Sequence, residues 1–437
     1  MTSSLRRATA FALVATLALS APVLGRLTVV PFGLVAVAAF FTSEGPLFEL
    51  FARPGDRREG RLVGLASFAL GAGGLALLTA GFGMPVEVYV ATVLLVGYGN
   101  LAATATLEVR AAAVARAIGY TVGAFLAGVA GQVAAATVAG GVGATPAPFP
   151  RVVFLAAAGA LLAALIRSAF VGEEDPLVVF TVGFLLWLFA DLQVSVGWVT
   201  VTGALAVTVG LGYVSWALDT ASVTGMLTGV LLALLTLVLG GYQWLVILVA
   251  FFAVGSLATK FRYGEKQERG VAEPEGGARG TGNILGNSAP ALLAVVLFAA
   301  SPRLPLDPVV FEFAFAGSVA TALADTLSSE IGGLYDDPRL VTTLEPVAPG
   351  TDGAVTWQGE LAGLGGAATI AGLALALFGL PPTGAVAVAA AGVAGMTVDS
   401  VLGATVEGDL VGNRSVNFLA TGAGAVVGGA LAVALGL

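Results

Sequence analysis

Apolar segments of near membrane-spanning length follow one another from the first residues of the chain to the last. With about 20 apolar residues per spanning helix as the yardstick, the pattern predicts about fifteen transmembrane helices, within a range of about 13–15. We expect them at residues 8–24, 27–42, 62–82, 84–99, 112–139, 151–168, 177–193, 194–213, 218–240, 242–259, 283–300, 309–328, 356–380, 384–402 and 415–436. The sequence therefore predicts an all-α fold, a polytopic helix bundle integral to a membrane.

The first 25 residues, MTSSLRRATAFALVATLALSAPVLG, have two interpretations. Arg6 and Arg7, an apolar core and then small residues are typical of a secretory signal peptide. The same pattern fits a first membrane helix. We favour the helix, because the rest of the chain is itself membrane-spanning.

Polar residues gather in three segments near the C-terminus: Lys260–Asn287, Ala324–Gly353 and Asp399–Asn417. The first polar segment contains the only two lysines of the chain, Lys260 and Lys266. Charged residues are costly in lipid, so their retention in clusters indicates a functional site. The division of the chain near these segments predicts an N-terminal multi-helix membrane region, residues 1–245, and a C-terminal membrane domain with polar loops, residues 246–437.

Charge asymmetry predicts the topology. With the N-terminus in the cytoplasm, sixteen of the nineteen Lys and Arg residues fall on cytoplasmic connections, and only Arg26, Arg151 and Arg303 fall outside. All three polar segments then lie on the cytoplasmic face of a multi-pass protein of the cell membrane. Segments that are far apart in sequence would meet at one membrane surface.

Composition narrows the chemistry of such a site. The chain has no histidine and no cysteine, which excludes thiol nucleophiles, disulfides, the usual zinc and haem sites and histidine general bases. Asp, Glu, Asn, Thr, Ser, Lys and Arg remain, and these side chains suit oxygen-ligated cations and phosphates. A net charge of −8 argues against nucleic acid as a partner.

Carboxylates stand where two predicted helices end. Asp325 is followed by Glu330, and Asp399 is followed by Glu407 at i+8. Such pairs can share a Mg²⁺ ion or hold its water ligands. The alternative is that these are solvated helix-end residues.

Asn283 and Asn287 are spaced i and i+4 at the start of a predicted helix. A glycine-flanked helix start favours an anion, and Lys260, Lys266, Arg269 and Arg279 could supply counter-charge for phosphates. The alternative is an ordinary positive-inside loop, which needs no ligand. The Lys-Ser/Thr signature of a P-loop is missing from GTGNILGN.

Four motifs, in this order, carry a family resemblance: YGEKQERGVAEPEGGARGTGNILGN, ADTLSSEIG, PRLVTTLEPVAPGTDGAVTWQGELAGLGG and DSVLGATVEGDLVGNRSVNFLATG. Residues 240–437 resemble the transmembrane protein 19 family, also known as domain of unknown function 92. One plant and cyanobacterial branch of that family consists of phytyl-phosphate kinases, which convert phytyl phosphate to phytyl diphosphate with a nucleoside triphosphate.

The resemblance implies roles for individual residues. Metal ligands are expected at Asp325, Glu330, Asp399 and Glu407. Phosphate contacts are expected at Lys260, Lys266, Arg269 and Arg279, and the site would be shaped by Asn283, Asn287, Thr343, Asp352, Asn413 and Asn417. Asp325, Asp399 and Lys266 are the expected catalytic residues, with Mg²⁺ and a nucleoside triphosphate such as CTP as cofactors.

These expectations favour a membrane-embedded prenyl-phosphate kinase acting on phytyl, geranylgeranyl or similar phosphates. The rival hypotheses are a transporter or lipid flippase, and a non-catalytic membrane scaffold. A kinase predicts carboxylates and basic residues meeting at one membrane face. A transporter predicts acidic residues near the bilayer midplane and a cavity open to both sides. No clear internal repeat is present, which weighs against an inverted-repeat transporter.

Overall fold

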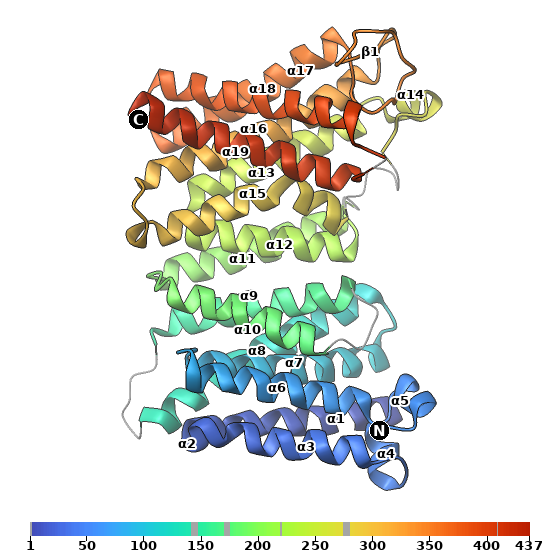
Figure 1. The fold of residues 1–437 in the computed structure, drawn as a ribbon, viewed down its shortest axis with the longest axis vertical. Helices are drawn as coiled ribbons and strands as arrows, with labels where there is room; N and C mark the ends of the chain where they lie inside the picture. The colour runs from blue at the N-terminus through green and yellow to red at the C-terminus, as the bar shows by residue number, and fades with distance from the viewer. Residues whose placement is uncertain (1, 141–146, 170–174, 219–220, 274–279, 409) are drawn as a thin grey trace. The chain divides into compact units, whose positions relative to one another are not determined.

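The computed structural model describes residues 2–140, 147–169, 175–218, 221–273, 280–408 and 410–437 (Figure 1). Each of the predicted spans coincides with a helical segment, which confirms the all-α membrane fold. Twelve helical stretches in the described ranges are long and apolar enough to cross a membrane. The first of these, Ser3–Phe41, covers the first two predicted spans, and two further predicted spans form shorter apolar helices, Pro176–Asp191 and Val223–Leu239.

The chain divides into two compact units, Met1–Leu205 and Ala206–Leu437. This division lies 40 residues before the boundary predicted at 245/246. The physical reason is the packing of helix α12 (Val223–Leu239), which contacts α13 (Tyr242–Lys260) and α15 (Thr281–Ala300) of the second unit. The change of unit falls inside α11 (Trp198–Ala217), and few of this helix's side chains are buried.

The first unit is a bundle of long helices with short helical connections. Its elements are α1 (Ser3–Ala15), η1 (Thr16–Ser20), α2 (Ala21–Leu24), η2 (Gly25–Thr28), α3 (Val29–Phe41), α4 (Pro46–Phe51), α5 (Pro54–Glu59), α6 (Val63–Gly81), α7 (Val86–Val109), α8 (Ala113–Gly140), α9 (Phe149–Ala169) and α10 (Asp175–Asp191). Helix α1 packs against α7, where Ala12 and Ala15 of α1 meet Gly97. In the structure, the segment with two interpretations forms α1, η1 and α2, and α1 is one of the packed helices of this unit.

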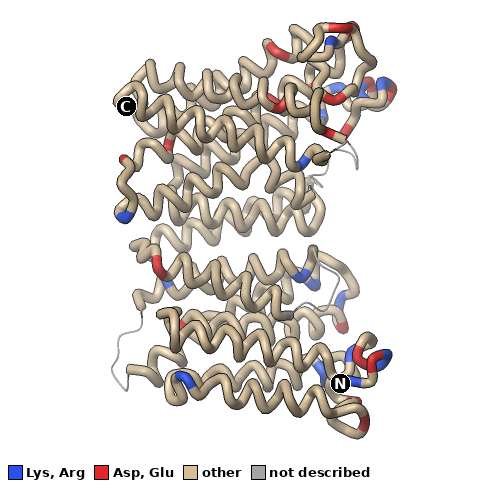
Figure 2. The backbone as a smooth tube through the Cα atoms, in the orientation of Figure 1, with Lys and Arg blue, Asp and Glu red and all other residues tan. Residues whose placement is uncertain are grey.

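The second unit continues with α14 (Tyr263–Glu268), η4 (Ser301–Arg303), α16 (Pro308–Gly332), α17 (Trp357–Phe378), α18 (Pro382–Thr405) and α19 (Asn413–Leu435). Strands β1 (Arg339–Leu340) and β2 (Ala354–Val355) pair antiparallel, with Arg339 opposite Val355, in the loop between α16 and α17. Charged residues of this unit gather mainly at the end that carries α14 and β1 (Figure 2).

Helix α16 is the centre of the second unit and contacts α13, α15, α17, α18 and α19. Its residues from Phe315 to Ala324 are all buried. Small residues make this possible, since a Cβ on Gly317 would collide with the carbonyl oxygen of Gly424 in α19. At the opposite end from the polar loops, the ring of Trp244 packs, tilted, against Phe315 at 4.6 Å and Phe298 at 4.7 Å, ring centre to ring centre.

A proline inside α15 joins this helix to α19. Pro290 has no N–H, so the carbonyl of Gly286, four residues earlier, loses its normal helical partner. The hydroxyl of Thr421 in α19 donates a hydrogen bond of 3.2 Å to that carbonyl. In lipid, no water could satisfy the group, so this bond fixes which part of α19 faces α15.

We expect Gly317→Ala to lower the stability of the protein by about 1–3 kcal/mol, because the new methyl group would collide with the rigid backbone of Gly424 in α19. The measurement is thermal denaturation of the purified protein in detergent. Gly365→Ala is the matched control, since nothing lies within 4 Å of a Cβ added at that position of α17. Equal melting temperatures for the two variants would contradict the close packing of α16 against α19.

Candidate functional site

Four helix ends meet at the polar end of the second unit. Asn283 and Asn287 lie in the first two turns of α15, and Asn413 and Asn417 lie in the first two turns of α19. Asp325 and Asp399 lie in the last two turns of α16 and α18. These six side chains line one cavity of about 180 Å³, together with Thr259, Val271, Glu273, Thr326, Ser329 and Glu330.

The two aspartates are the centre of the cavity. Their carboxyl groups approach each other from α16 and α18 closely enough to share a hydrogen bond. With its nitrogen turned toward Asp399, the amide of Asn417 lies 3.3 Å from Oδ1 of Asp399. In the same orientation its oxygen accepts from Nδ2 of Asn287 at 3.3 Å. The result is a hydrogen-bonded chain from α15 through α19 to the paired aspartates.

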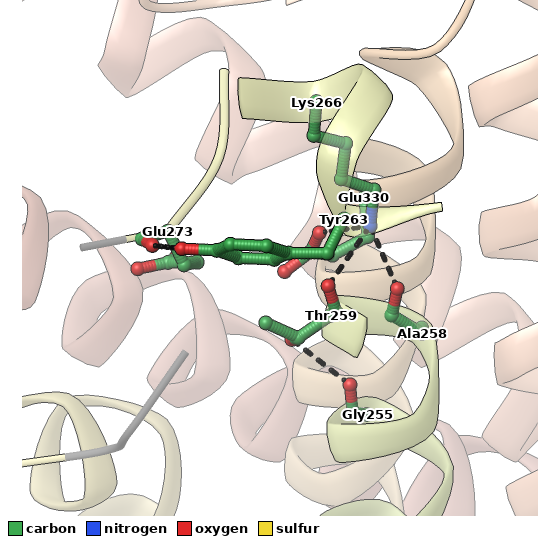
Figure 3. A network of polar contacts seen from close by, with 7 residues as sticks. All are labelled: Gly255, Ala258, Thr259, Tyr263, Lys266, Glu273 and Glu330. Carbon is green, nitrogen blue, oxygen red and sulfur yellow. Dashed lines mark hydrogen bonds and ion pairs between the residues drawn. The ribbon is translucent and has the colours of Figure 1, made fainter. Parts of the chain in front are cut away.

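Glu330 is turned toward a lysine (Figure 3). The Nζ atom of Lys266 donates to Oε2 of Glu330 at 2.6 Å and to the carbonyls of Ala258 and Thr259 at 2.7 and 3.3 Å. The two side chains are only 1% and 8% exposed. Lys266, predicted to be catalytic and to bind phosphate, thus has three protein acceptors and is not among the described residues that line the cavity.

The helix that carries Lys266 also positions one wall of the cavity. Arg262 has a left-handed backbone (φ 50°) that turns the chain from α13 into α14. The N–H of Val271 then donates to the carbonyl of Lys266 at 2.9 Å, and the hydroxyl of Tyr263 donates to the carbonyl of Glu273 at 2.7 Å (Figure 3). These bonds hold Val271 and Glu273 at the cavity.

The other predicted basic residues lie elsewhere. Lys260 is exposed at the end of α13, and Arg269 forms an ion pair of 2.6 Å with the exposed Asp336. Arg279 lies outside the described residues. The first polar segment therefore brings its asparagines to the cavity, whereas none of its described cations lines it.

The loop between α16 and α17 is held against the end of α18. Gly353 has φ +73° and sits so close to α18 that a Cβ there would lie 2.5 Å from the carbonyl oxygen of Ser400. Asp352, which precedes Gly353, is exposed, and its negative charge repels that of Glu407 just beyond α18. Thr343 is exposed, and its hydroxyl accepts a hydrogen bond from the N–H of Glu345 at 3.3 Å. Neither of these loop residues is among the described residues that line the cavity.

Burial raises the pKa of the Glu407 carboxyl, and the negative charge of Asp352 raises it further. A hydrogen bond with Asn413 acts in the opposite direction. Glu407 therefore lies next to the cavity-lining Asn413 without lining the cavity among the described residues.

The four carboxylates predicted as metal ligands do not form one set. Across the described ranges, no group of three or more Asp, Glu, His or Cys side chains is placed to hold a metal ion. Asp325 and Asp399 are together, Glu330 is paired with Lys266, and Glu407 lies beyond the end of α18. What could hold a cation is the pair of aspartates with amide and hydroxyl oxygens around it.

Sequence reasoning missed Thr259 and Glu273, which the structure places in the cavity wall. Glu273 belongs to the first polar segment, so a signal was present, but its position depends on the hydrogen bond from Tyr263. Nothing in the sequence marked Thr259 as a cavity residue, because a threonine near the end of an apolar helix is common.

Comparison with known proteins supports the resemblance. Residues 206–426 match the model of the integral membrane protein family DUF92, which is half of the chain and nearly all of the second unit. The chain belongs to the DUF92 family. All the residues of the cavity lie in the matched region.

Three DUF92 relatives show how far the similarity extends. An uncharacterized membrane protein of Synechocystis is 35% identical over 43% of this chain and 73% of its own length. An uncharacterized membrane protein of Methanocaldococcus jannaschii is 34% identical over 47% of this chain and 82% of its own. The chloroplastic protein VTE6 of Arabidopsis thaliana is 33% identical over 43% of this chain and 56% of its own. No solved structure matches the chain.

We expect Lys266→Met to destabilise the protein by about 3–5 kcal/mol, because it leaves the buried Glu330 carboxylate without its partner. The double variant Lys266→Met/Glu330→Gln should recover most of that loss. Thermal denaturation in detergent checks both, with Lys260→Met as the exposed-lysine control. A melting temperature of Lys266→Met equal to that of the control would show that the ion pair has no structural role.

Asp352→Asn should lower the pKa of Glu407, because it removes one of the charges that raise it. A carboxyl whose pKa is raised by folding stabilises the folded state as it takes up its proton, so stability rises as the pH falls through that pKa. This rise should be smaller in Asp352→Asn and disappear in Glu407→Gln. Melting temperatures measured from neutral pH down to about the ordinary glutamate value of 4.5 test this, with Glu345→Gln as the control. Identical pH profiles for all four proteins would contradict it.

Proposed function

We propose that the protein is a prenyl-phosphate kinase, which transfers the terminal phosphoryl group of a nucleoside triphosphate to a phytyl, geranylgeranyl or similar monophosphate. The observation that carries the proposal is the cavity of paired aspartates and asparagines at the ends of membrane helices. The resemblance of this region to the family that includes phytyl-phosphate kinases gives the reaction class. A shared fold does not by itself establish a shared activity, so the proposal rests on the residues and geometry of the site.

The proposed chemistry places little demand on a general base. An oxygen of the prenyl monophosphate attacks the terminal phosphorus, the bond to the nucleoside diphosphate breaks, and the prenyl diphosphate forms. The attacking oxygen is already anionic, so no strong base has to remove a proton. Phosphoryl transfer depends mainly on position and charge, which suits a chain without histidine or cysteine.

The donor atoms of the cavity fit Mg²⁺. This ion takes one or two protein carboxylates and completes its octahedron with phosphate oxygens and water. Asp325 and Asp399 are two such carboxylates facing each other, and Asn283 and Ser329, whose side chains carry an amide oxygen and a hydroxyl oxygen, line the same cavity. When bound, Mg²⁺ would neutralise phosphate charge there.

The depth of the aspartates favours an enzyme over a transporter. Asp325 lies seven residues from the end of α16 and Asp399 six from the end of α18, so each is about 10 Å from its helix end at 1.5 Å per residue. The midplane of a bilayer core about 30 Å thick lies deeper. A prenyl chain in the bilayer could lie along the exposed Leu285, Phe418 and Leu419 of α15 and α19 while its phosphate entered the cavity.

The proposed function also includes an orientation of the protein in the membrane. The excess of Lys and Arg on one set of connections favours a cytoplasmic position for the cavity end and the N-terminus. Nucleoside triphosphates are available on that side.

The decisive assay uses the purified full chain with radiolabelled nucleoside triphosphate, Mg²⁺ and a panel of prenyl monophosphates. Wild type should form prenyl diphosphate, and Asp325→Asn should reduce the rate by about 100-fold or more, because it removes a charge from the reacting centre. Glu345→Gln, an exposed carboxylate of the α16–α17 loop, is the control and should keep the wild-type rate. No diphosphate from wild type with any substrate of the panel would overturn the proposal, as would full activity of Asp325→Asn.

A further inference from the structure

The wall of the cavity carries negative charge, and none of the described basic residues predicted to bind phosphate lies in it. Four carboxylates line it, from Glu273, Asp325, Glu330 and Asp399, and no Lys or Arg is among the described lining residues. Lys266 forms an ion pair with Glu330, and Arg269 forms one with Asp336. Lys260 is exposed at the end of α13. A protein cation that binds a phosphate in this cavity, in addition to any metal ion, must therefore come from another part of the chain.

Arg414 stands beside the cavity. It lies in the first turn of α19, directly after the cavity-lining Asn413. Its side chain crosses the start of α15, where a Cβ on Gly282 would lie 2.5 Å from Cδ, 2.6 Å from Nε and 2.8 Å from Cζ. Gly282 in turn precedes the cavity-lining Asn283. The guanidinium therefore lies against Gly282, and the residues next to Gly282 and Arg414, Asn283 and Asn413, both line the cavity.

Packing against α15 fixes the position of Arg414, and the charge of its guanidinium takes no part in this packing. A Cβ on Gly286 would lie 2.8 Å from the carbonyl oxygen of Arg414, so the backbone of α19 is seated directly on α15. In the part of the chain that the structure describes, the guanidinium itself makes no hydrogen bond or ion pair. An exposed arginine with a restricted stem and an unused planar fork is suited to a phosphate, which it can bind through two parallel hydrogen bonds.

We propose that Arg414 binds a phosphate group of the ligand that occupies the cavity, and that the absence of a side chain at Gly282 lets its guanidinium lie across the start of α15. This inference rests on the proposed function, because it assumes a phosphate-bearing ligand. The phosphate can belong to the prenyl monophosphate or to the nucleotide, and direct binding measurements distinguish the two.

The experiment measures binding to the purified full chain in nanodiscs, with geranylgeranyl monophosphate and CTP titrated separately. Arg414→Gln should raise the Kd of at least one of them by about tenfold to a hundredfold, the loss typical of a hydrogen-bonded charge pair. The Kd of Arg414→Lys should lie between those of wild type and Arg414→Gln, since lysine keeps the positive charge but lacks the planar fork of the guanidinium. The ligand whose Kd changes identifies the source of the phosphate. Geranylgeraniol, which has no phosphate, should bind equally to all variants.

Two further variants separate this role from a general effect of charge. Arg262→Gln removes an exposed arginine of the same end, paired with Glu265, and should leave both Kd values unchanged. Gly282→Ala keeps every charge but displaces the Arg414 side chain, so it should weaken phosphate binding as Arg414→Ala does. Adding Gly282→Ala to Arg414→Ala should then have no further effect. The melting temperature of each variant checks that it is folded.

The outcomes distinguish this inference from the kinase proposal. Unchanged Kd values for both phosphates in Arg414→Gln overturn the inference, whether or not wild type forms diphosphate. A wild type that binds a phosphate through Arg414 but transfers no phosphoryl group upholds the inference and overturns the kinase. A wild type that binds neither phosphate overturns both.

Discussion

Close approach of one helix backbone to another at glycine is the interaction on which the second unit depends. Lipid is as apolar as leucine, so helices in a membrane associate through close packing and hydrogen bonds, not through the exclusion of water. Gly317 and Gly424 let α16 and α19 touch, and Gly286 does the same for α15 and α19. These contacts bring the ends of four helices within reach of one another. The aspartates of α16 and α18 and the asparagines of α15 and α19 share one cavity for this reason.

The need to satisfy buried polar groups then sets the register of the packed helices. Because Pro290 has no N–H, the carbonyl of Gly286 has no helical hydrogen-bond partner, and the hydroxyl of Thr421 donates to it instead. Lys266 binds the last carbonyls of α13 and the carboxylate of Glu330, which ties α13, α14 and α16 together. Each of these contacts leaves little freedom for a helix to slide, because sliding would leave a polar group unpaired away from water. Positions of the cavity residues thus follow from groups that are not themselves in the cavity.

Most of the fold and about half of the site could be predicted from the sequence. Apolar length locates the helices, since a spanning helix has few other solutions. Asp325, Asp399 and the four asparagines stood out as polar residues at the ends of apolar helices, and they do meet. Lys266 stood out for a different reason, as one of the only two lysines of the chain, but the rarity of lysine says nothing about its partner, and Glu330 is 64 residues away. Arg414 looked like one more positive-inside residue, because its relation to Gly282 depends on how α15 crosses α19.

The two units differ in what they contribute to the cavity. Every described lining residue belongs to the second unit, which begins at residue 206, where the match to the DUF92 family also begins. A match of 213 residues covers 82% of the relative from Methanocaldococcus jannaschii, so that protein has little length left for a counterpart of the first unit. Among the described residues, the hydrogen bonds that join the aspartates to the asparagines, and those that tie α13, α14, α15, α16 and α19 together, all lie within the second unit.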